Sequence, residues 1–205
     1  MRTVHRVLAI GAHPDDLELG CGASLAKLTA RGVHVRALVL TDGLRGVAGP
    51  VRRCEETRNA LEQLGVTDVV QHRLPDTALP TMQAELIKLI EAHSEDLSPD
   101  RVYTMFRDDR HQDHRAVYEA SIIACRSVPQ ILSYETPSSW PNFMPVVFEP
   151  VGDHIAEKIA ALRHHVSQRD RTYMQASQIF CSAQFRGQQV GLGPSEGFIP
   201  YKLAL

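Results

Sequence analysis

Two short segments hold most of the residues whose types and spacing could do chemistry. The first is Gly11-Ala12-His13-Pro14-Asp15-Asp16, which places an imidazole and two carboxylates within four residues. Pro14 fixes one φ angle and removes a hydrogen-bond donor, so the turn is rigid. A tight turn can bring His13 and Asp16 onto one point, with Asp15 turned elsewhere. One aspartate would be enough to cap a helix, and we therefore interpret this segment as a functional site.

The second segment is Asp108-Asp109-Arg110-His111-Gln112-Asp113-His114-Arg115. His114 is suited to bind a metal as a neutral imidazole, and His111 and Asp113 are near enough to share its pocket. Alone, this segment is equally compatible with a solvated polar loop. Taken together, the two segments predict a metal site formed by His13, Asp16 and His114. Two imidazoles and one carboxylate leave a coordination position free, which is the catalytic rather than the structural form of a zinc site.

Such a site predicts hydrolysis of an amide. Zinc lowers the pKa of a bound water to about 7 and polarises a carbonyl group. Asp15 is adjacent to a ligand without being needed as one, so it can take the proton from that water. A protonated His111 held by Asp113 would stabilise the tetrahedral oxyanion. The predicted catalytic residues are therefore Asp15, His111 and Asp113.

Alternating apolar runs and helical periods indicate how these segments are positioned. Strands are predicted over residues 7–10, 33–40, 66–70, 102–105 and 131–134, and helices over 17–30, 52–64, 82–93 and 116–126. The alternation predicts a Rossmann-like, doubly wound and mainly parallel sheet in a three-layer α/β/α fold. Ligands bind at the carboxyl ends of such strands. The two segments follow the first and fourth strands, and these strands can lie side by side, so that both segments face one crevice.

The rest of the chain narrows the class of protein. After Thr136 we expect an irregular C-terminal third, with a helix over 153–168 and a glycine-rich tail over 185–200. A dinucleotide fingerprint is not supported, because the GxGxxG spacing is missing. The 22 basic and 24 acidic residues give a net charge of −2, which offers no footprint for nucleic acid.

The length predicts a single domain over residues 1–205. Because no targeting signal is evident, we expect the protein in the cytoplasm. No apolar segment approaches the roughly 20 residues that span a bilayer, and no signal peptide is evident. The four cysteines form no CxxC pair, and we expect reduced, mostly buried thiols. The sequence leaves open whether the chain is a homo-oligomer.

Both segments resemble motifs of the PIG-L / LmbE-like zinc-dependent N-deacetylase family. Residues 12–16 match its Ala-His-Pro-Asp-Asp motif and residues 111–114 its His-x-Asp-His motif. The resemblance implies His13, Asp16 and His114 as zinc ligands, Asp15 as general base and His111 as the group that stabilises the oxyanion. It also implies removal of acetyl groups from N-acetylglucosaminyl compounds, which include thiol-cofactor precursors, glycolipid anchors and antibiotic intermediates.

Weaker matches extend the resemblance along the chain. Arg53 and Asp76 occupy the places of family residues near the substrate, and residues 165–168 and 196–198 resemble family C-terminal motifs. Each has a plainer interpretation: Arg53 as a surface arginine, Asp76 as a turn former and His165 as a residue of a helix face. One departure concerns the substrate, because Leu44 stands where many members have a glutamate that contacts the sugar.

Three functions therefore remain in view. The first is hydrolysis of an N-acetyl or other N-acyl group on a small molecule, expected to be a sugar derivative, with Zn²⁺ as the cofactor. A non-haem Fe(II) oxygenase is the second, because the same two imidazoles and carboxylate form the facial triad of that class, and Fe²⁺ is the alternative ion. The third is a non-catalytic Rossmann-like module that binds a small molecule, which would not need Asp15, His111 and Asp113 together.

Overall fold

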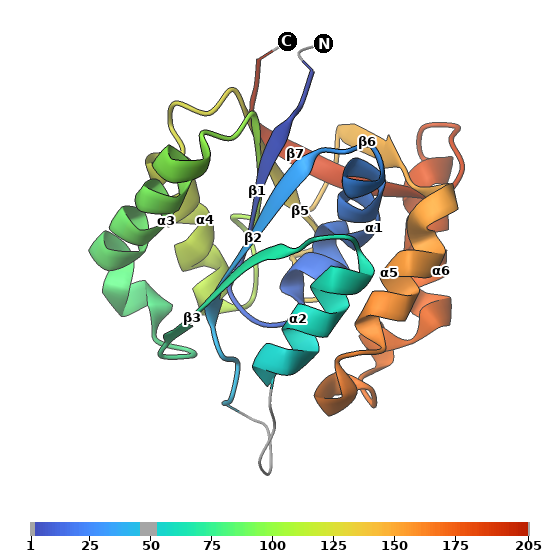
Figure 1. The fold of residues 1–205 in the computed structure, drawn as a ribbon. Helices are drawn as coiled ribbons and strands as arrows, with labels where there is room; N and C mark the ends of the chain where they lie inside the picture. The colour runs from blue at the N-terminus through green and yellow to red at the C-terminus, as the bar shows by residue number, and fades with distance from the viewer. Residues whose placement is uncertain (1–2, 46–52, 205) are drawn as a thin grey trace.

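The five predicted strands form the parallel part of one sheet. The computed structural model describes residues 3–45 and 53–204, and its seven strands lie in the order β3-β2-β1-β4-β5-β7-β6 (Figure 1). The apolar, β-branched runs pair in parallel as far as β5, which confirms a mainly parallel α/β sheet. The parallel strands are β1 (Arg6–Gly11), β2 (His34–Thr41), β3 (Asp68–Leu74), β4 (Arg101–Thr104) and β5 (Gln130–Tyr134).

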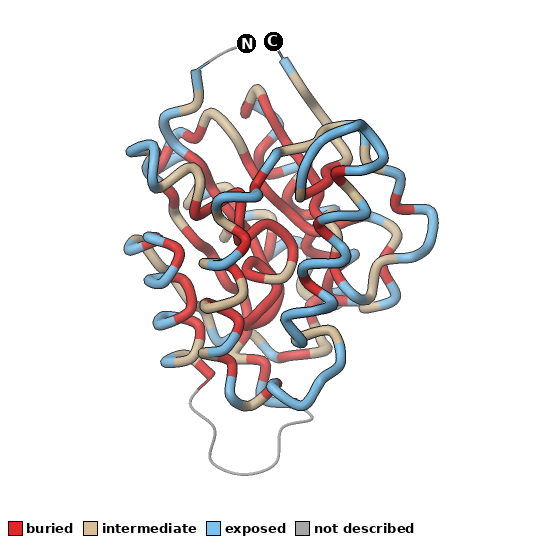
Figure 2. Tube along the Cα trace, turned by 90° about the vertical axis from the view of Figure 1, so that its right-hand side faces the viewer, coloured by how far each residue is buried: buried red, intermediate tan, exposed pale blue. Residues whose placement is uncertain are grey.

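Helices cover both faces of this sheet. In Figure 1, α3 and α4 lie on one face, and α1, α2, α5 and α6 lie on the other. The strands between them are largely buried, whereas the outer turns of the helices are exposed (Figure 2). The predicted start of the second helix, Arg52, falls outside the described residues. The helices are α1 (Asp16–Ala30), α2 (Arg53–Gln63), α3 (Gln83–Leu97), α4 (Gln112–Ala124), α5 (Ile155–Leu162) and α6 (Ala176–Gln188).

The strand order reverses between β1 and β4. From β1 the chain builds outward through β2 and β3, then returns to place β4 and β5 on the other side of β1. β1 and β4 pair in parallel, with Ala9 opposite Tyr103, as the sequence predicted. The loops that leave these two strands therefore diverge around a crevice at their carboxyl ends, the place where ligands bind in open α/β sheets.

The C-terminal third is more regular than we predicted. Residues 185–200 are not irregular, because they contain the end of α6 and most of β7 (Ser195–Leu203), which pairs antiparallel with β5 and with β6 (Val147–Pro150). Pro200 suggested a break, but it lies beside a bulge: Ile131 pairs with Lys202 and Leu132 with Pro200, so Tyr201 is the extra residue. Bulges tolerate proline inside a sheet.

The helix predicted over residues 153–168 is also shorter than expected. After the 3₁₀ turn η2 (Gly152–His154), α5 ends at Leu162, and a second turn, η3, spans Val166–Gln168. Glu18 contacts Nε2 of His165 at 2.9 Å, and Glu56 accepts bonds from the backbone N–H and the hydroxyl of Ser167. These side-chain contacts replace helical hydrogen bonds and tie the segment to α1 and α2.

Two expectations about the chain's environment can be compared with the structure. All four cysteines are free thiols, of which Cys21 and Cys125 are buried, Cys54 is half-buried and Cys181 is exposed. The expectation of mostly buried thiols is therefore correct for two of the four. Within the described residues, no helix combines the length and the apolar character that a bilayer-spanning segment needs.

The first helix is kinked beside the ring of Tyr134, the last residue of β5. Cys21 has φ −139° and ψ 16°, which are not helical values. At Gly20 the ring of Tyr134 lies so close that a Cβ atom would come within 2.0 Å of its Cδ2 atom. The hydroxyl of Tyr134 donates to the carbonyl oxygen of Ile10 in β1 at 2.8 Å, so the ring is fixed. Gly20 therefore allows α1 to approach the sheet closely.

Replacing Gly20 by alanine is expected to lower the free energy of unfolding by about 1–3 kcal/mol, because the buried ring of Tyr134 has to move. Gly22→Ala is a matched control in the same helix, since its Cβ would make only ordinary contacts, at 3.4 Å to Lys158 and 3.5 Å to Leu64. Urea unfolding measures both variants. Equal unfolding free energies for the two would contradict the steric role of Gly20.

Candidate metal centre and active site

Three side chains from two loops converge at the crevice between β1 and β4. Nδ1 of His13 lies 3.3 Å from Nε2 of His114 and 3.5 Å from Oδ2 of Asp16, and Oδ1 of Asp16 lies 3.4 Å from Nε2 of His114. Tetrahedral zinc with ligand bonds of about 2.0–2.1 Å places its ligand atoms about 3.3–3.4 Å apart. The three side chains are therefore spaced as ligands of one ion.

The charge around these atoms also favours a cation. Burial lowers the pKa of His13, but hydrogen bonds to carboxylates outweigh it and raise that pKa well above its ordinary value. The same balance, led by Asp16, raises the pKa of His114 to about 9. The pKa of Asp16 is well below its ordinary value, because both imidazoles outweigh its burial. The cluster thus attracts positive charge at the point where its ligand atoms meet.

A buried carboxylate that the sequence interpretation missed orients His114. Oδ2 of Asp109 lies 3.1 Å from Nδ1 of His114, on the side of the ring away from His13, and the hydroxyl of Ser138 lies 3.3 Å from the same nitrogen. Asp109 is fully buried. A carboxylate on the far nitrogen fixes the tautomer of a metal-binding imidazole and raises its basicity. The only sequence signal was an aspartate five residues before a candidate ligand.

Asp113 does not hold His111 as we predicted. Its carboxylate lies 3.1 Å from Nε2 of His13 and accepts bonds from the backbone N–H groups of Thr77 and Leu79. The physical reason is that α4 begins at Gln112, so the side chain of Asp113 is directed toward the loop after β3. Only the backbone N–H of Asp113 contacts His111, by donating to its Nδ1. Asp113 therefore orients His13 as Asp109 orients His114.

Asp76 makes a similar contact with His13. Its Oδ1 lies 3.2 Å from Nε2 of His13, and its Oδ2 accepts the backbone N–H of Arg45 at 3.1 Å. Asp76 also lines the cavity above the cluster, where we predicted that it contacts the substrate. The structure thus places this carboxylate between His13 and the loop after β2.

Asp15 is buried beside the cluster without joining it. Its backbone is left-handed, with φ 90°, and its side chain makes no capping bond to α1. Instead Nη2 of Arg53 donates to Oδ2 of Asp15 at 3.1 Å. Burial raises the pKa of Asp15 to about 7, although the positive charges of His165 and Arg53 oppose it. A carboxylate with such a pKa can exchange a proton near neutral pH.

Arg53 supports this turn from the first residue of α2. It is buried, and its guanidinium group also donates to the carbonyl oxygens of Pro14 at 2.8 Å and Gly43 at 2.7 Å. Gly43 has φ 60°, and a Cβ there would lie 2.3 Å from Nη1 of Arg53. Arg53 therefore joins the loops after β1 and β2, besides lining the cavity where we predicted a substrate contact.

His111 is half-buried, and its ring centroid lies 4.5 Å from that of His13 and 4.8 Å from that of His114. Its Nδ1 accepts the backbone N–H of Asp113 at 3.2 Å, so the neutral ring carries its proton on Nε2. Burial, then the charges of His13 and His114, lower the pKa of His111 below its ordinary value. This shift disfavours the protonated ring, and the predicted protonated His111 stays a prediction. The neutral ring still offers an N–H donor.

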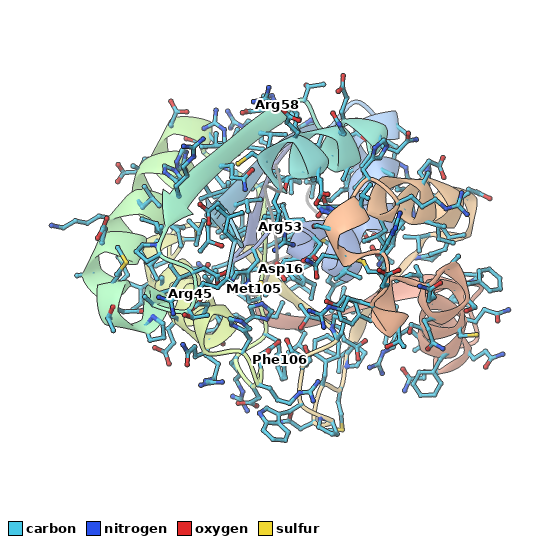
Figure 3. The ribbon with its side chains drawn as sticks, turned by 90° about the horizontal axis from the view of Figure 1, so that it is seen from below. Asp16, Arg45, Arg53, Arg58, Met105 and Phe106 are labelled. Atoms are coloured by element: carbon cyan, nitrogen blue, oxygen red, sulfur yellow. The ribbon has the colours of Figure 1, made fainter. Side chains whose placement is uncertain are left out.

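A cavity of about 410 Å³ opens above these residues, at the carboxyl ends of the strands. Figure 3 looks toward this edge of the sheet, with Asp16 and Arg53 near its centre and Arg45 to one side. Its lining combines the candidate ligands with Gln168 and Tyr173 from the C-terminal third. The volume suits a small molecule.

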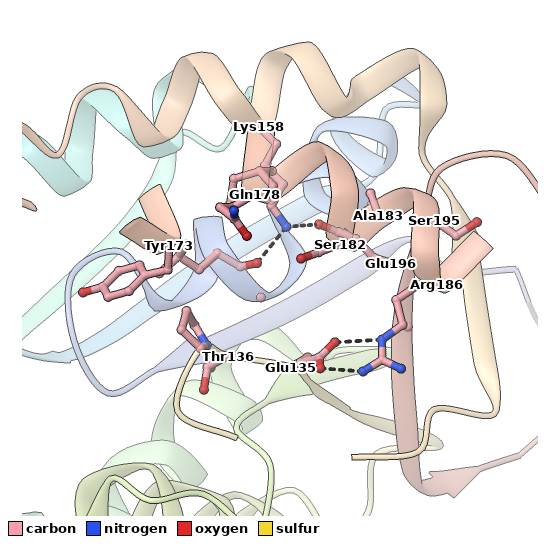
Figure 4. A pocket seen from close by; sticks show the side chains of 15 residues that line it. Glu135, Thr136, Lys158, Tyr173, Gln178, Ser182, Ala183, Arg186, Ser195 and Glu196 are labelled. Carbon is pink, nitrogen blue, oxygen red and sulfur yellow. Dashed lines mark hydrogen bonds and ion pairs between the residues drawn. The ribbon is translucent and has the colours of Figure 1, made fainter. Parts of the chain in front are cut away.

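A second cavity adjoins the first and shares Tyr173 and Thr136 with it. Figure 4 shows two ion pairs in its wall: Glu135 with Arg186, and Lys158 with Glu196. Glu196 also accepts the backbone N–H groups of Ala23 and Ser24, just after the kink in α1. Of the predicted C-terminal motifs, Glu196 and His165 thus support α1, and Gln168 reaches the active-site cavity.

Comparison with known proteins decides the family. The model of the family described as PIG-L, GlcNAc-PI de-N-acetylase, matches residues 8–125, which is more than half of the chain. The chain belongs to the PIG-L family. The uncharacterized deacetylase YaiS of Escherichia coli (strain K12) is 49% identical over 167 residues, covering 78% of this chain and 90% of that protein.

Two further similar proteins extend the comparison. The diacetylchitobiose deacetylase of Thermococcus kodakarensis is 30% identical over 188 residues, covering 80% of this chain and 70% of that enzyme. The crystal structure of the conserved protein TT1542 from Thermus thermophilus superposes with a TM-score of 0.85 at 26% identity, covering 99% of this chain and 97% of that one. The PIG-L assignment identifies the chain as an enzyme of the N-deacetylase type. Among the described residues, two groups are spaced so that they could hold a metal: His13 with His111 and His114, and His13 with Asp76 and Asp113.

Proposed function

We propose that the chain is a zinc-dependent hydrolase that removes an N-acetyl or other N-acyl group from a small molecule containing an amino sugar. One observation carries the proposal: two imidazole nitrogens and the carboxylate oxygens of Asp16 lie 3.3–3.5 Å apart, beside a buried aspartate that is not among them. A metal site with a free position and a separate base is the arrangement that metal-assisted amide hydrolysis requires.

His13, Asp16 and His114 would hold the zinc ion, and Asp109 and Asp113 would orient the two imidazoles. When bound there, zinc activates a water molecule and polarises the acyl carbonyl. All three ligand side chains are nearly buried, which strengthens their electrostatic interactions with a bound ion. Because the orienting carboxylates are held by backbone N–H groups and hydroxyls, the ligands are preorganised.

Asp15 and His111 would move and stabilise charge during the reaction. Asp15 accepts the proton of the attacking water at its carboxylate, while Arg53 keeps that carboxylate facing the cavity. The Nε2–H group of His111 donates to the acyl oxygen as negative charge develops on it. Asp15 then returns the proton to the leaving nitrogen, and the products are a carboxylate and a free amine.

The substrate class is supported by the relatives and by the cavity. One relative is named as a deacetylase of diacetylchitobiose, and others as deacetylases of an inositol-linked 2-acetamido-2-deoxy-glucopyranoside. The cavity of about 410 Å³ is lined largely by polar and charged side chains, which suits a polar sugar derivative rather than an apolar ligand.

The test is release of amine from N-acetylglucosamine and N,N'-diacetylchitobiose. We expect activity from zinc-loaded protein, none after removal of metal by a chelator, and recovery on adding zinc. His114→Ala should lose bound zinc and activity together, whereas His154→Ala, at the turn before α5, should retain both. Amine release that persists in metal-free protein would contradict the proposal, and oxygen consumption with Fe²⁺ without amine release would favour the oxygenase.

A further inference from the structure

We propose that Arg45, Arg110 and Arg171 form an anion-binding mouth at the entrance of the active-site cavity, and that the natural substrate carries a phosphate or carboxylate group besides its acylated amine. All three line the same cavity as the candidate ligands. The inference rests on the proposed function, because it names a further chemical feature of the substrate bound at that site. We call these three residues the arginine mouth.

The arginine mouth is assembled from three separate segments. Arg45 follows β2, and its backbone N–H is held by Asp76, which contacts His13. Arg110 precedes α4, and its backbone N–H donates to the carbonyl oxygen of Ser138 at 3.0 Å. Arg171 lies between the last two 3₁₀ turns, η3 and η4 (Thr172–Met174), where its backbone N–H donates to the carbonyl oxygen of Gln168. Each position is therefore fixed by a backbone contact beside the cavity.

The guanidinium groups of the arginine mouth retain free donors. Within residues 3–45 and 53–204, the side chains of Arg45 and Arg171 form no hydrogen bond or ion pair, and both residues are exposed. Arg110 uses Nε and Nη2 on the carbonyl oxygens of Ser138 and Pro137, which leaves Nη1 free. Three positively charged residues thus line the cavity with donors available.

The acidic residues of the same cavity do not neutralise these charges. Asp15, Asp16 and Asp76 are buried, and each already contacts a positively charged or imidazole partner. The arginine mouth is also not the result of an overall excess of basic residues, because the net charge of the chain is −2. Positive charge is therefore concentrated at the entrance of the cavity.

Arginine at these positions favours one kind of ligand group. Its planar fork presents parallel N–H donors that match the oxygens of a carboxylate or a phosphate. Such a group on one end of the substrate would leave the acylated nitrogen free to reach the buried ligands and Asp15. The arginine mouth would then position the substrate and raise its local concentration.

The experiment compares three probes on zinc-loaded protein: N-acetylglucosamine, N-acetylglucosamine 6-phosphate and N-acetylmuramic acid. Calorimetry gives Kd for each, and amine release gives KM. We expect at least one anionic probe to bind about tenfold or more tightly than the neutral probe, with the preference shrinking as salt is raised. The phosphate and carboxylate arms show which anion is preferred. In Arg45→Gln/Arg171→Gln the preference should fall below about threefold.

Arg58→Gln/Arg163→Gln is the matched control, since it removes the same charge from exposed residues outside the cavity; Figure 3 shows Arg58 at the rim of the molecule, away from Asp16. This variant should keep the preference. Equal affinities in the wild type, or a preference that survives in Arg45→Gln/Arg171→Gln because the metal binds the anion, would overturn the inference. Anion-selective binding without amine release would contradict only the hydrolase proposal. Amine release without anion selectivity would contradict only the proposed arginine mouth.

Discussion

Asp15→Ala is expected to lower kcat for amine release by about 100- to 10,000-fold, the range that a positioned general base contributes. The carboxylate is buried, held by Arg53 at 3.1 Å and free of any capping bond to α1. The bound zinc should stay at one ion per chain, because Asp15 is not one of the spaced ligands. Burial raises the pKa of Asp15 to about 7; the base is the ionised form, so wild-type kcat should rise as pH increases through this pKa.

The variant should lack this acidic limb in its pH–rate profile. Asp153→Ala provides the control, since this exposed aspartate lies on the turn before α5 and does not line the cavity. Zinc content, kcat and circular dichroism are measured on all three proteins. An Asp15→Ala enzyme with wild-type kcat and an unchanged pH profile would remove Asp15 from the mechanism, whereas loss of zinc would make Asp15 a ligand.

Glu196→Ala is expected to reduce the free energy of unfolding by about 3–5 kcal/mol, the usual cost of leaving a buried charge without its partner. Glu196 is 5% exposed and Lys158 is 6% exposed, and their charged atoms lie 2.7 Å apart. The substitution also leaves the backbone N–H groups of Ala23 and Ser24 without their acceptor at the kink of α1. Urea unfolding measures the loss.

Two further variants distinguish the contribution of the ion pair from that of the hydrogen bonds that Glu196 accepts from α1. Lys158→Met should cost less than Glu196→Ala, because the carboxylate keeps its two backbone donors in that variant. Glu91→Ala breaks the ion pair with the exposed Arg126 and should cost at most about 1 kcal/mol. If Glu196→Ala cost no more than Glu91→Ala, the buried pair would not stabilise the fold.

The position of the candidate metal site was predictable because it depends on sheet topology. Once strands alternate with helices, the loops after β1 and β4 are expected at one crevice, and His13, Asp16 and His114 do meet there. The contacts around them were not predictable in the same way. Asp109 and Asp113 share the second segment, and spacing alone does not show which imidazole each carboxylate faces, because that depends on where α4 begins and how its first turn is rotated.

The C-terminal third shows a second limit of sequence patterns. Gly197 and Pro200 are typical of loops, yet both lie in β7. Gly197 fits because Pro145 leaves no room for a side chain there, and Pro200 is accepted beside a bulge. Both reasons depend on strands that arrive from elsewhere in the chain. Local propensity therefore predicted the parallel strands well, because they contain continuous apolar runs. It predicted the antiparallel strands β6 and β7 less well.

Because Glu196 in β7 supports α1, this helix is fully supported only after β7 has been synthesised. At translation rates of roughly 5–20 residues per second, residues 13–16 are made roughly ten seconds or more before Glu196 exists. A nascent chain that already contains both motif segments still lacks the acceptor for Ala23 and Ser24 and the counter-charge for Lys158. Synthesis of β7, rather than completion of the motifs, is therefore the step at which the candidate metal-binding loop obtains a stable helix behind it.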